Sequence, residues 1–275
     1  MSKSVAERDA RFDGSIPEMY DRHLGPLLFE PYAVDLARRI AKRQPRKVLE
    51  IAAGTGIVTR RLLDALPRET ALTVTDLNPP MLDYARERIR SNGRDVEWRQ
   101  ADAQELPFAD ESFDVVACQF GVMFFPDKPK GLREFKRVLE KGGALIFSVW
   151  DSLKNNPLPE LAHSTIGKFF QTDPPEFYMI PFMLGDVGEL RQLVEGAGFR
   201  DIAIETLTLT GRSESSQHAA EGLVKGNPVI NALRERGTAD IDDIVAAVAS
   251  AVEERFGAGA LEVPLRAHVV SAVKA

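Results

Sequence analysis

The sequence has one cysteine, no long apolar run and no excess of positive charge. Cys118 alone cannot form a disulfide within the chain, and every apolar stretch is shorter than the roughly 20 residues of a membrane-spanning helix. The N-terminal stretch MSKSVAERDARFDGS lacks the apolar core of a signal peptide. The net charge of −6 provides no general attraction to nucleic acid or to an acidic membrane. We therefore expect a cytoplasmic protein with neither nucleic acid nor a membrane as its partner.

Strand-like and helix-like patterns alternate through the first half of the chain. Short apolar strands are expected at residues 47–51, 71–76, 95–101, 113–120 and 143–150. Two later segments, 201–211 and 263–274, also have strand character. The alternation predicts an α/β fold with a doubly wound, mainly parallel, Rossmann-like sheet of seven strands. Helical additions are expected at the N-terminus and after strands five and six.

We expect the whole chain, residues 1–275, to form a single domain, because no repeat or low-complexity segment divides it. Residues 1–45 are assigned to a helical cap and residues 46–150 to a cofactor-binding core. The expected insertions on the substrate side are 151–185 and 212–260. The segments expected to complete the sheet are 186–211 and 261–275. Residues 151–185 are rich in proline and aromatic side chains, and their pattern is too irregular for another βα unit.

The segment VLEIAAGTGIVT, residues 48–59, predicts a strand, a tight turn and the start of a helix. Gly54 and Gly56 allow a ligand to approach the backbone, and the N–H groups at the helix start can bind its polar atoms. The dinucleotide fingerprint G-x-G-x-x-G is incomplete, since Thr59 stands where the third glycine is needed. Glu50 ends the strand, where it would repel a pyrophosphate but could receive an ammonium group. The favoured ligand is a positively charged nucleoside without phosphates, such as S-adenosylmethionine (SAM).

Carboxylates after the next two strands favour the same ligand. Asp76 ends the second strand, where it can accept hydrogen bonds from both ribose hydroxyls. Asp102 follows the third strand and can accept a hydrogen bond from the adenine amine. Each also has a structural interpretation: Asp76 could cap the helix that begins near Asn78, and Asp102 could form an Asx turn.

Four stretches, taken together, resemble one protein family. They are VLEIAAGTG, TDLNPPMLDYAR, WRQADAQELPFADESFDVVACQFGVMFF and REFKRVLEKGG. In this order and spacing, over roughly residues 45–150, they resemble the class I SAM-dependent methyltransferases. The likeness is greatest to the small-molecule type 11 branch, which includes quinone methyltransferase-like proteins. The resemblance implies methyl transfer from SAM to a small molecule by in-line displacement.

The resemblance also implies that residues at the carboxyl ends of the first four strands bind SAM. Those that would border the methionine half and the ribose are Glu50, Ala52, Gly54 and Gly56. Those that would surround the ribose hydroxyls and the adenine are Asp76, Leu77, Met81, Asp102 and Ala103. Those that would line the site near the sulfonium are Gln119 and Phe120. The family usually has glycine where this chain has Ala52, which makes the turn slightly more crowded.

One aromatic residue outside these motifs, Tyr20, is a further candidate for cofactor binding. The N-terminal helix of such methyltransferases often lies over the cofactor, where an aromatic ring can face the sulfonium through cation–π attraction. An ordinary position on a helix surface is the alternative. No catalytic residue is assigned, and no metal site is expected, because His163, His218 and His268 are isolated in the sequence.

The methyl acceptor is expected to bind between the less regular segments, 12–32, 151–185 and 214–260. Their aromatic side chains favour a small apolar or aromatic molecule, although the same rings could simply bury the insertion against the sheet. Two other classes of function stay open at this point. One is an NAD-dependent oxidoreductase on a similar sheet, and the other is a protein that binds SAM without catalysis.

Overall fold

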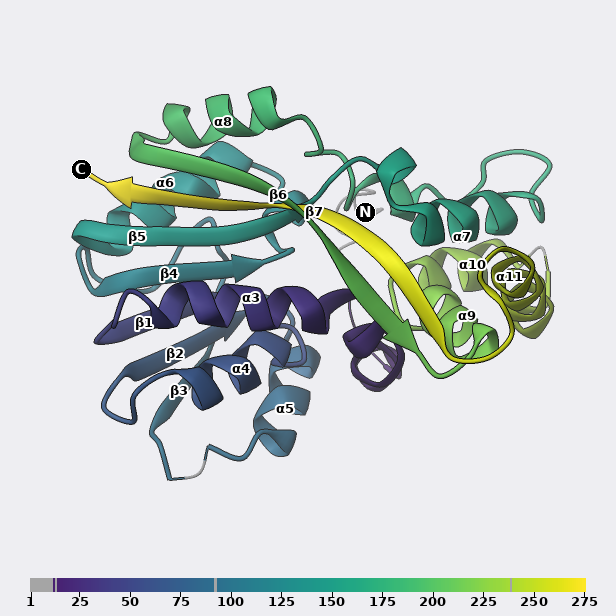
Figure 1. The fold of residues 1–275 in the computed structure, drawn as a ribbon, viewed down its shortest axis with the longest axis horizontal. Helices are drawn as coiled ribbons and strands as arrows, with labels where there is room; N and C mark the ends of the chain where they lie inside the picture. The colour runs from purple at the N-terminus through teal and green to yellow at the C-terminus, as the bar shows by residue number, and fades with distance from the viewer. Residues whose placement is uncertain (1–11, 13, 92, 238) are drawn as a thin grey trace.

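A seven-stranded sheet runs through the computed structural model, which describes residues 12, 14–91, 93–237 and 239–275 (Figure 1). Its strands are β1 (Lys47–Ile51), β2 (Ala71–Asp76), β3 (Val96–Gln100), β4 (Phe113–Gln119), β5 (Leu139–Trp150), β6 (Phe199–Ser213) and β7 (Leu261–Lys274). Their order is β3-β2-β1-β4-β5-β7-β6. β7 runs antiparallel to β5 and β6, and the other pairs are parallel. The predicted mainly parallel sheet of seven strands is confirmed.

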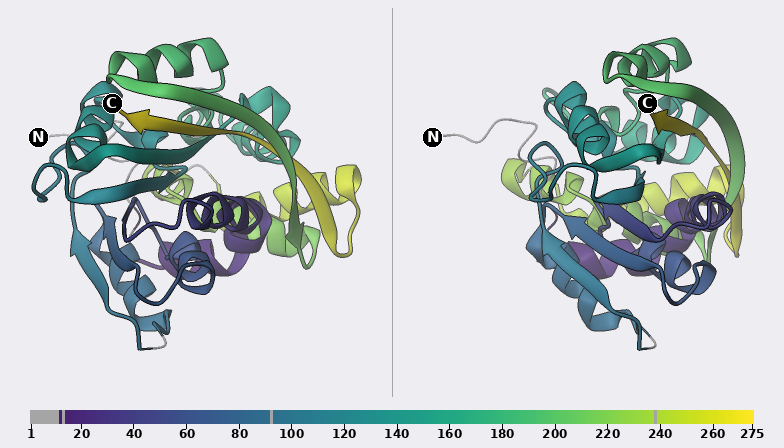
Figure 2. Two further views of the ribbon diagram at one scale, coloured as in Figure 1. Left: turned by 60° about the vertical axis from the view of Figure 1, so that its left-hand side comes forward. Right: turned by 90° about the vertical axis from the view of Figure 1, so that its left-hand side faces the viewer.

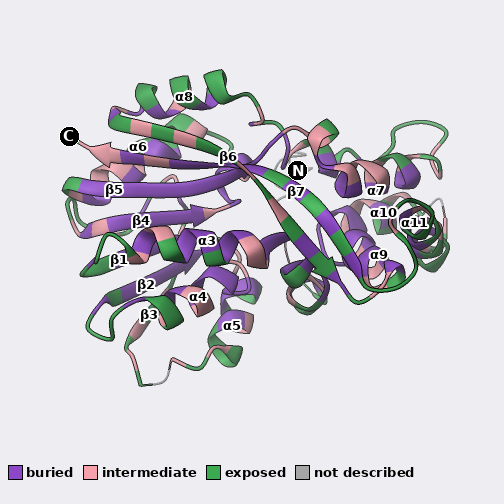
Figure 3. Cartoon of the chain, in the orientation of Figure 1, coloured by how far each residue is buried: buried purple, intermediate pink, exposed green. Residues whose placement is uncertain are grey.

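Helices that precede or connect the strands pack against the sheet. They are α3 (Glu30–Ala41), α4 (Ile57–Ala65), α5 (Pro79–Arg88), α6 (Lys128–Val138) and α8 (Val187–Gly196). α3 packs against α4 and crosses in front of the sheet in the view of Figure 1, whereas α6 and α8 contact each other. The central strands are buried between these layers, as the purple colour in Figure 3 shows. β4 is mostly buried and the last eight residues of β5 are all buried, which explains their nearly unbroken apolar sequences.

A second group of helices lies beyond the carboxyl ends of the parallel strands (Figures 1 and 2). It consists of α7 (Pro157–Gly167), α9 (Ser216–Lys225), α10 (Val229–Arg236) and α11 (Ile241–Phe256), with α11 packed on α7 and α9. β6 and β7 continue past the sheet as a long arch that reaches these helices. The pairing in the arch runs from Phe199 opposite Lys274 to Ser213 opposite Leu261.

The N-terminal cap, defined here as residues 14–29, contains α2 (Ile16–Met19) and the π-helix η1 (Tyr20–Phe29). η1 packs on α9 and on β6. The approach to β6 is so close that a Cβ on Gly211 would lie 1.8 Å from the carbonyl oxygen of Leu27. Glycine at this point of β6 therefore lets the cap rest directly on the sheet.

Most predicted elements match the structure within two residues at each end, with two exceptions. β5 begins at Leu139 rather than at residue 143, because the chain passes from α6 into the strand without an intervening loop. Helical structure was expected after strand five, but the irregular pattern of 151–185 did not predict the bounds of the helix α7. Its first residue is Pro157, and proline is well tolerated in the first turn, where the missing N–H would have no helical partner.

Candidate active site

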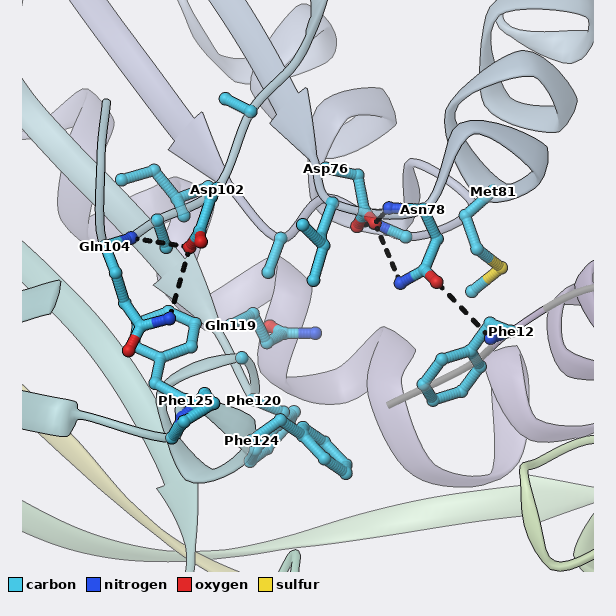
Figure 4. A pocket seen from close by; sticks show the side chains of 18 of the residues that line it. Phe12, Asp76, Asn78, Met81, Asp102, Gln104, Gln119, Phe120, Phe124 and Phe125 are labelled. Atoms are coloured by element: carbon cyan, nitrogen blue, oxygen red, sulfur yellow. Dashed lines mark hydrogen bonds between the residues drawn. The ribbon is translucent and has the colours of Figure 1, made fainter. Parts of the chain in front are cut away.

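A cavity of about 500 Å³ lies at the carboxyl ends of β1, β2 and β4 (Figure 4). The N-terminal residues that line it are Phe12, which precedes the cap, and Tyr20 of the cap. The lining from the strand ends and the following loops consists of Ile51, Ala52, Gly54, Asp76, Leu77, Asn78, Met81, Ala101, Asp102, Ala103, Gln104, Gln119, Phe120, Gly121, Phe124, Phe125 and Pro126. Ten of the twelve residues predicted to bind the cofactor thus share one cavity, and the two outside the lining are Glu50 and Gly56.

Asp76 fastens the glycine turn to the start of α5. Its Oδ2 accepts a hydrogen bond from the backbone N–H of Gly54 at 2.8 Å, and its Oδ1 accepts one from the N–H of Asn78 at 2.7 Å. The side chain of Asn78 does not cap α5, although it stands at the N-cap position. Burial raises the pKa of Asp76 above its ordinary value, and the two backbone bonds oppose that shift. Oδ1 also accepts a longer bond from Asn78 Nδ2 at 3.5 Å, so Oδ2 is the oxygen that keeps a lone pair for a ligand in the cavity.

Glu50 lies beneath the turn rather than in the wall of the cavity. Only 2% of its surface is exposed, and its Oε2 accepts a hydrogen bond from Thr59 Oγ1 at 2.6 Å. Its Oε1 is buried and has no hydrogen-bond partner among the described residues. Burial raises the pKa of Glu50 to about 8, and the bond from Thr59 partly offsets this effect. The sequence predicts Glu50 at the border of the ligand, whereas the structure places it below the turn, where burial favours its neutral form and a nearby cation would favour its ionised form.

Two further residues of the turn have conformations that explain their identities. Ala52 has φ +54°, in the left-handed region where glycine is favoured, so the glycine usual in the family is the relaxed choice here. The methyl group of Ala52 also leaves no room opposite, because a Cβ on Gly121 would lie 2.5 Å from it. Gly56 has φ +79°, and a Cβ there would lie 2.3 Å from Ile89 Cδ1. Gly56 thus lets α4 begin close to α5, outside the lining of the cavity.

The rim near β2 and β3 combines apolar and acidic groups. Met81 and Ala103 are buried, whereas Leu77 is 51% exposed at the mouth. Asp102 Oδ1 accepts hydrogen bonds from the backbone N–H of Gln104 at 2.8 Å and from its Nε2 at 3.3 Å. The first of these is the bond of an Asx turn, so the structural interpretation of Asp102 applies. Asp102 nevertheless lines the cavity, and both recorded bonds use the same oxygen.

Aromatic rings form the opposite end of the cavity. Tyr20 stacks on Phe29 with ring centroids 4.7 Å apart, and the ring of Phe12 meets Tyr20 edge-on at 5.8 Å. Phe120 stacks on Trp150 at 3.9 Å. Burial raises the pKa of the Tyr20 hydroxyl far above its ordinary value, and the nearby carboxylate of Asp76 adds to the shift. Tyr20 therefore presents a neutral aromatic ring to the cavity.

Gln119 lies between the acidic rim and the aromatic rings, as Figure 4 shows. Its Nε2 donates to the carbonyl oxygen of Phe29 at 3.1 Å, which ties the end of η1 to the end of β4. Its Oε1 is buried and has no hydrogen-bond partner among the described residues. Phe120, the next residue, has φ +54°, so the chain turns sharply as it leaves β4. Unpaired polar atoms and strained backbone of this kind gather at ligand sites.

Several lining residues were not predicted to bind the cofactor. They are Phe12, Ile51, Asn78, Ala101, Gln104, Gly121, Phe124, Phe125 and Pro126. The motifs do point to all of them except Phe12, because the others stand within six residues of a predicted position and at the same edge of the sheet. The sequence alone does not distinguish a ligand contact from packing at Phe124 and Phe125, since aromatic runs after a buried strand usually belong to the core.

Comparison with known proteins shows to which family this chain belongs. Residues 32–213 match the ubiE/COQ5 methyltransferase family. This chain belongs to that family. It is 30% identical over 198 residues to the ubiquinone/menaquinone biosynthesis C-methyltransferase UbiE of Idiomarina loihiensis, covering 66% of this chain and 76% of that protein. It is 35% identical over 164 residues to a demethylmenaquinone methyltransferase of Thermus thermophilus, covering 59% and 70%.

Solved structures of low sequence identity share the fold of this ubiE/COQ5 family member. The YcgJ protein of Bacillus subtilis has a TM-score of 0.58 at 18% identity, over 88% of this chain and 98% of that one. A phosphoethanolamine N-methyltransferase of Haemonchus contortus, in complex with S-adenosylhomocysteine, has a TM-score of 0.56 at 20% identity, over 94% and 56%. The match to the family confirms the predicted class I fold and the predicted SAM-dependent methyltransferase activity. The alternative of an NAD-dependent oxidoreductase does not fit this family.

A membrane-spanning helix and a group of metal ligands are both absent from the described residues. No helix in that part of the chain has the length and apolar character needed to cross a membrane. Within the same ranges, no three or more histidine, cysteine or acidic side chains are grouped as metal ligands would be.

Proposed function

We propose that SAM binds in the cavity with its adenosine between β2 and β3 and its sulfonium toward the aromatic end. The chemistry of the donor set supports this placement. Asp76 offers Oδ2 to one ribose hydroxyl and Oδ1 to the other, in place of its long bond from Asn78 Nδ2, and Asp102 offers Oδ2 to the adenine amine. Met81 and Ala103 provide an apolar floor for the base. No basic side chain is found among the described lining residues, as suits a ligand that carries no phosphate.

The charge around the proposed methionine half also matches SAM. Glu50 lies below the turn with an unpaired oxygen, and Asp76 lies beside it. Both carboxyl groups are held in a buried environment that raises their pKa values, so a cation nearby would stabilise their ionised forms. The ring of Tyr20 adds a surface that attracts a cation. When bound, SAM supplies an electrophilic methyl group on its sulfonium.

We propose that the acceptor is a small planar aromatic molecule, held at the aromatic end by Phe124, Phe125 and their neighbours. Phe124 stacks on Phe177 with centroids 6.3 Å apart, and Phe12 meets it edge-on at 6.2 Å. The quinone rings named for the relatives are of this class, and they are the first acceptors to test. The residues of this end would exclude water and hold the acceptor atom in line with the methyl group, and such orientation is a major part of the catalysis.

The wider context of the reaction is also a proposal. The whole chain would work as one domain, since a single apolar cluster includes residues of the cap, the sheet, α7 and α9 to α11. The cap would cover the cofactor, and the segments 151–185 and 212–260 would complete the acceptor side. We place the enzyme in the cytoplasm, on the basis of its single cysteine.

The cofactor placement is tested by calorimetric titration of S-adenosylhomocysteine into the wild type and Asp76→Asn. The variant should bind about 10 to 100-fold more weakly, because one ribose hydroxyl loses its acceptor and the turn loses a charge-assisted bond. Asp186→Asn is the matched control, since Asp186 caps α8 and lies outside the lining. Unchanged affinity of the Asp76 variant would exclude the placement.

The acceptor class is tested with radiolabelled SAM and a set of candidate acceptors. The set should contain demethylmenaquinol, simpler hydroquinones and phenols, and aliphatic amines of similar size. We expect transfer to members of the planar aromatic group. Transfer only to aliphatic amines would contradict the proposed class, and cofactor binding without transfer to any acceptor would favour the non-catalytic alternative.

A further inference from the structure

One carboxylate of the cap receives contacts from three other segments of the molecule. Asp21 Oδ1 accepts hydrogen bonds from Thr55 Oγ1 at 3.1 Å and from Arg60 Nη2 at 2.8 Å. Its Oδ2 accepts a longer one, at 3.4 Å, from the hydroxyl of Tyr84. Thr55 belongs to the glycine turn, Arg60 to α4 and Tyr84 to α5. The start of η1 is therefore joined to the turn and to both helices beneath the cavity.

The position of Asp21 in the chain relates these contacts to the cavity. Its neighbour Tyr20 lines the cavity, and adjacent residues of a helix point in different directions. Tyr20 thus forms part of the cavity wall. Asp21, next to it, holds the same turn of η1 through contacts on the side of the helix that faces away from the cavity. The segment is a π-helix of ten residues, a rare geometry that is frequent at functional sites.

The two ends of η1 are held by different forces. The far end is anchored by buried side chains, Leu24, Leu27 and Phe29, and by the bond from Gln119 to the carbonyl oxygen of Phe29. The near end combines the stacked ring of Tyr20 with an ion pair that is partly exposed, because the Asp21 side chain is 20% exposed and that of Arg60 is 35% exposed. Partly exposed ion pairs contribute little to global stability. Their loss would therefore release the near end of the helix without unfolding the protein.

We propose that Asp21 is a positioning residue that holds the cap closed over bound cofactor and so slows its dissociation. The inference rests on the proposed placement of SAM in the cavity. Thr55 carries the coupling, since it is 1% exposed and belongs to the turn on which the cofactor would lie. A cofactor that orders the turn would favour the closed cap, and a closed cap would retain the cofactor; such coupling is reciprocal.

The test compares dissociation rates of S-adenosylhomocysteine from the wild type and from Asp21→Asn. The intrinsic fluorescence of Trp150, which stacks on Phe120 of the cavity wall, is a suitable signal in a stopped-flow chase with excess SAM. A rapid filtration assay with radiolabelled SAM provides an independent signal. We expect the dissociation rate constant to rise about tenfold in the variant, because the amide cannot form the ion pair with Arg60.

The control is Glu30→Gln, which breaks the ion pair of Glu30 with Arg61 on the same helix α4. Glu30 begins α3 and lies outside the cavity lining. The control should change the dissociation rate less than twofold, and both variants should melt within a few degrees of the wild type. If the ion pairs of Asp21 and Glu30 were purely structural, both variants would have lower melting temperatures, and cofactor would dissociate from the folded variants as fast as from the wild type.

A double-mutant cycle tests whether Asp21 acts through Arg60. Arg60→Gln should increase the dissociation rate as Asp21→Asn does, and the double variant should show little further increase. Equal dissociation rates in the wild type and Asp21→Asn, combined with weaker binding in Asp76→Asn, would overturn the role of Asp21 alone. Unchanged binding in Asp76→Asn would instead overturn the cofactor placement, and the role of Asp21 with it.

Discussion

The two ends of the cavity are built in different ways. The end near β1, β2 and β3 is formed by short loops that directly follow the strands, and Asp76 holds two of those loops together through backbone N–H groups. The aromatic end gathers rings from the cap, from the loop after β4 and from the segment before α8. The first end depends on local geometry and the second on contacts between distant segments. A cofactor common to a family suits the first arrangement, and an acceptor that varies between members suits the second.

The largest effect is expected from Gly121→Ala, which tests the local geometry of the cofactor end. The new methyl group would lie 2.5 Å from Ala52 Cβ and 2.8 Å from Cys118 Sγ, inside a closely packed region. We expect the free energy of unfolding to fall by about 2–4 kcal/mol, measured by urea denaturation. Gly167→Ala is the control, because a Cβ on Gly167 meets no atom within 4 Å.

A second substitution can show how much of the stability lost in Gly121→Ala comes from the contact of the new methyl group with Ala52. Adding Ala52→Gly to Gly121→Ala should restore part of the lost stability, since it removes the nearer contact and relaxes the positive φ of residue 52. Additive effects of the two substitutions would show that the crowding between them is not the cause.

A smaller, pH-dependent effect is expected from Glu50→Gln. In the unfolded chain this carboxyl ionises near its ordinary pKa of 4.5, whereas burial keeps it protonated in the folded, ligand-free protein up to about pH 8. The unfolded state therefore binds fewer protons between these values, and the stability of the wild type should fall as the pH rises through that window. From pH 5 to pH 8 the variant should gain about 1–3 kcal/mol relative to the wild type in denaturation experiments. Parallel pH profiles would contradict the buried, protonated state of Glu50.

The smallest effect is expected at the aromatic end, from Phe124→Leu. Loss of ring contacts should raise the KM for the acceptor about 3 to 10-fold, while cofactor affinity stays within twofold. Phe108→Leu is the control, since Phe108 packs on Phe113 and lies outside the cavity lining. If Phe124→Leu changed cofactor affinity as much as the KM for the acceptor, the two ends of the cavity would not bind different ligands as proposed.

The same difference explains what could be predicted from sequence. The sheet, the glycine turn and the acidic rim follow from apolar strands and from residues next to them, so Asp76, Asp102 and Met81 could be assigned to one cavity. The position of Glu50 below the turn could not be predicted, because the sequence shows that a residue ends a strand but not how deeply its side chain is buried. The aromatic end could not be assembled either, since Phe177 and Phe124 meet only through the folding of distant segments.

Gly56 and Ala52 show the limit of motif reasoning in more detail. Both belong to the glycine turn and both have positive φ, so the same backbone requirement explains their small side chains. Only Ala52 lines the cavity, whereas Gly56 meets the side chain of Ile89. A motif records that a residue must be small without telling whether a ligand or a neighbouring helix requires it.

The arch of β6 and β7 has a consequence for the history of this enzyme. The strands pair up to Ser213 and Leu261, so the chain leaves the sheet and returns to it at adjacent points. The match to the family ends at residue 213, where β6 ends. Everything between these points, α9 to α11, can thus be lengthened, shortened or exchanged as a cassette while the ends of the break stay together. Under the proposed function, such changes would alter which molecules the scaffold methylates, as long as the face of α9 that packs on η1 is kept.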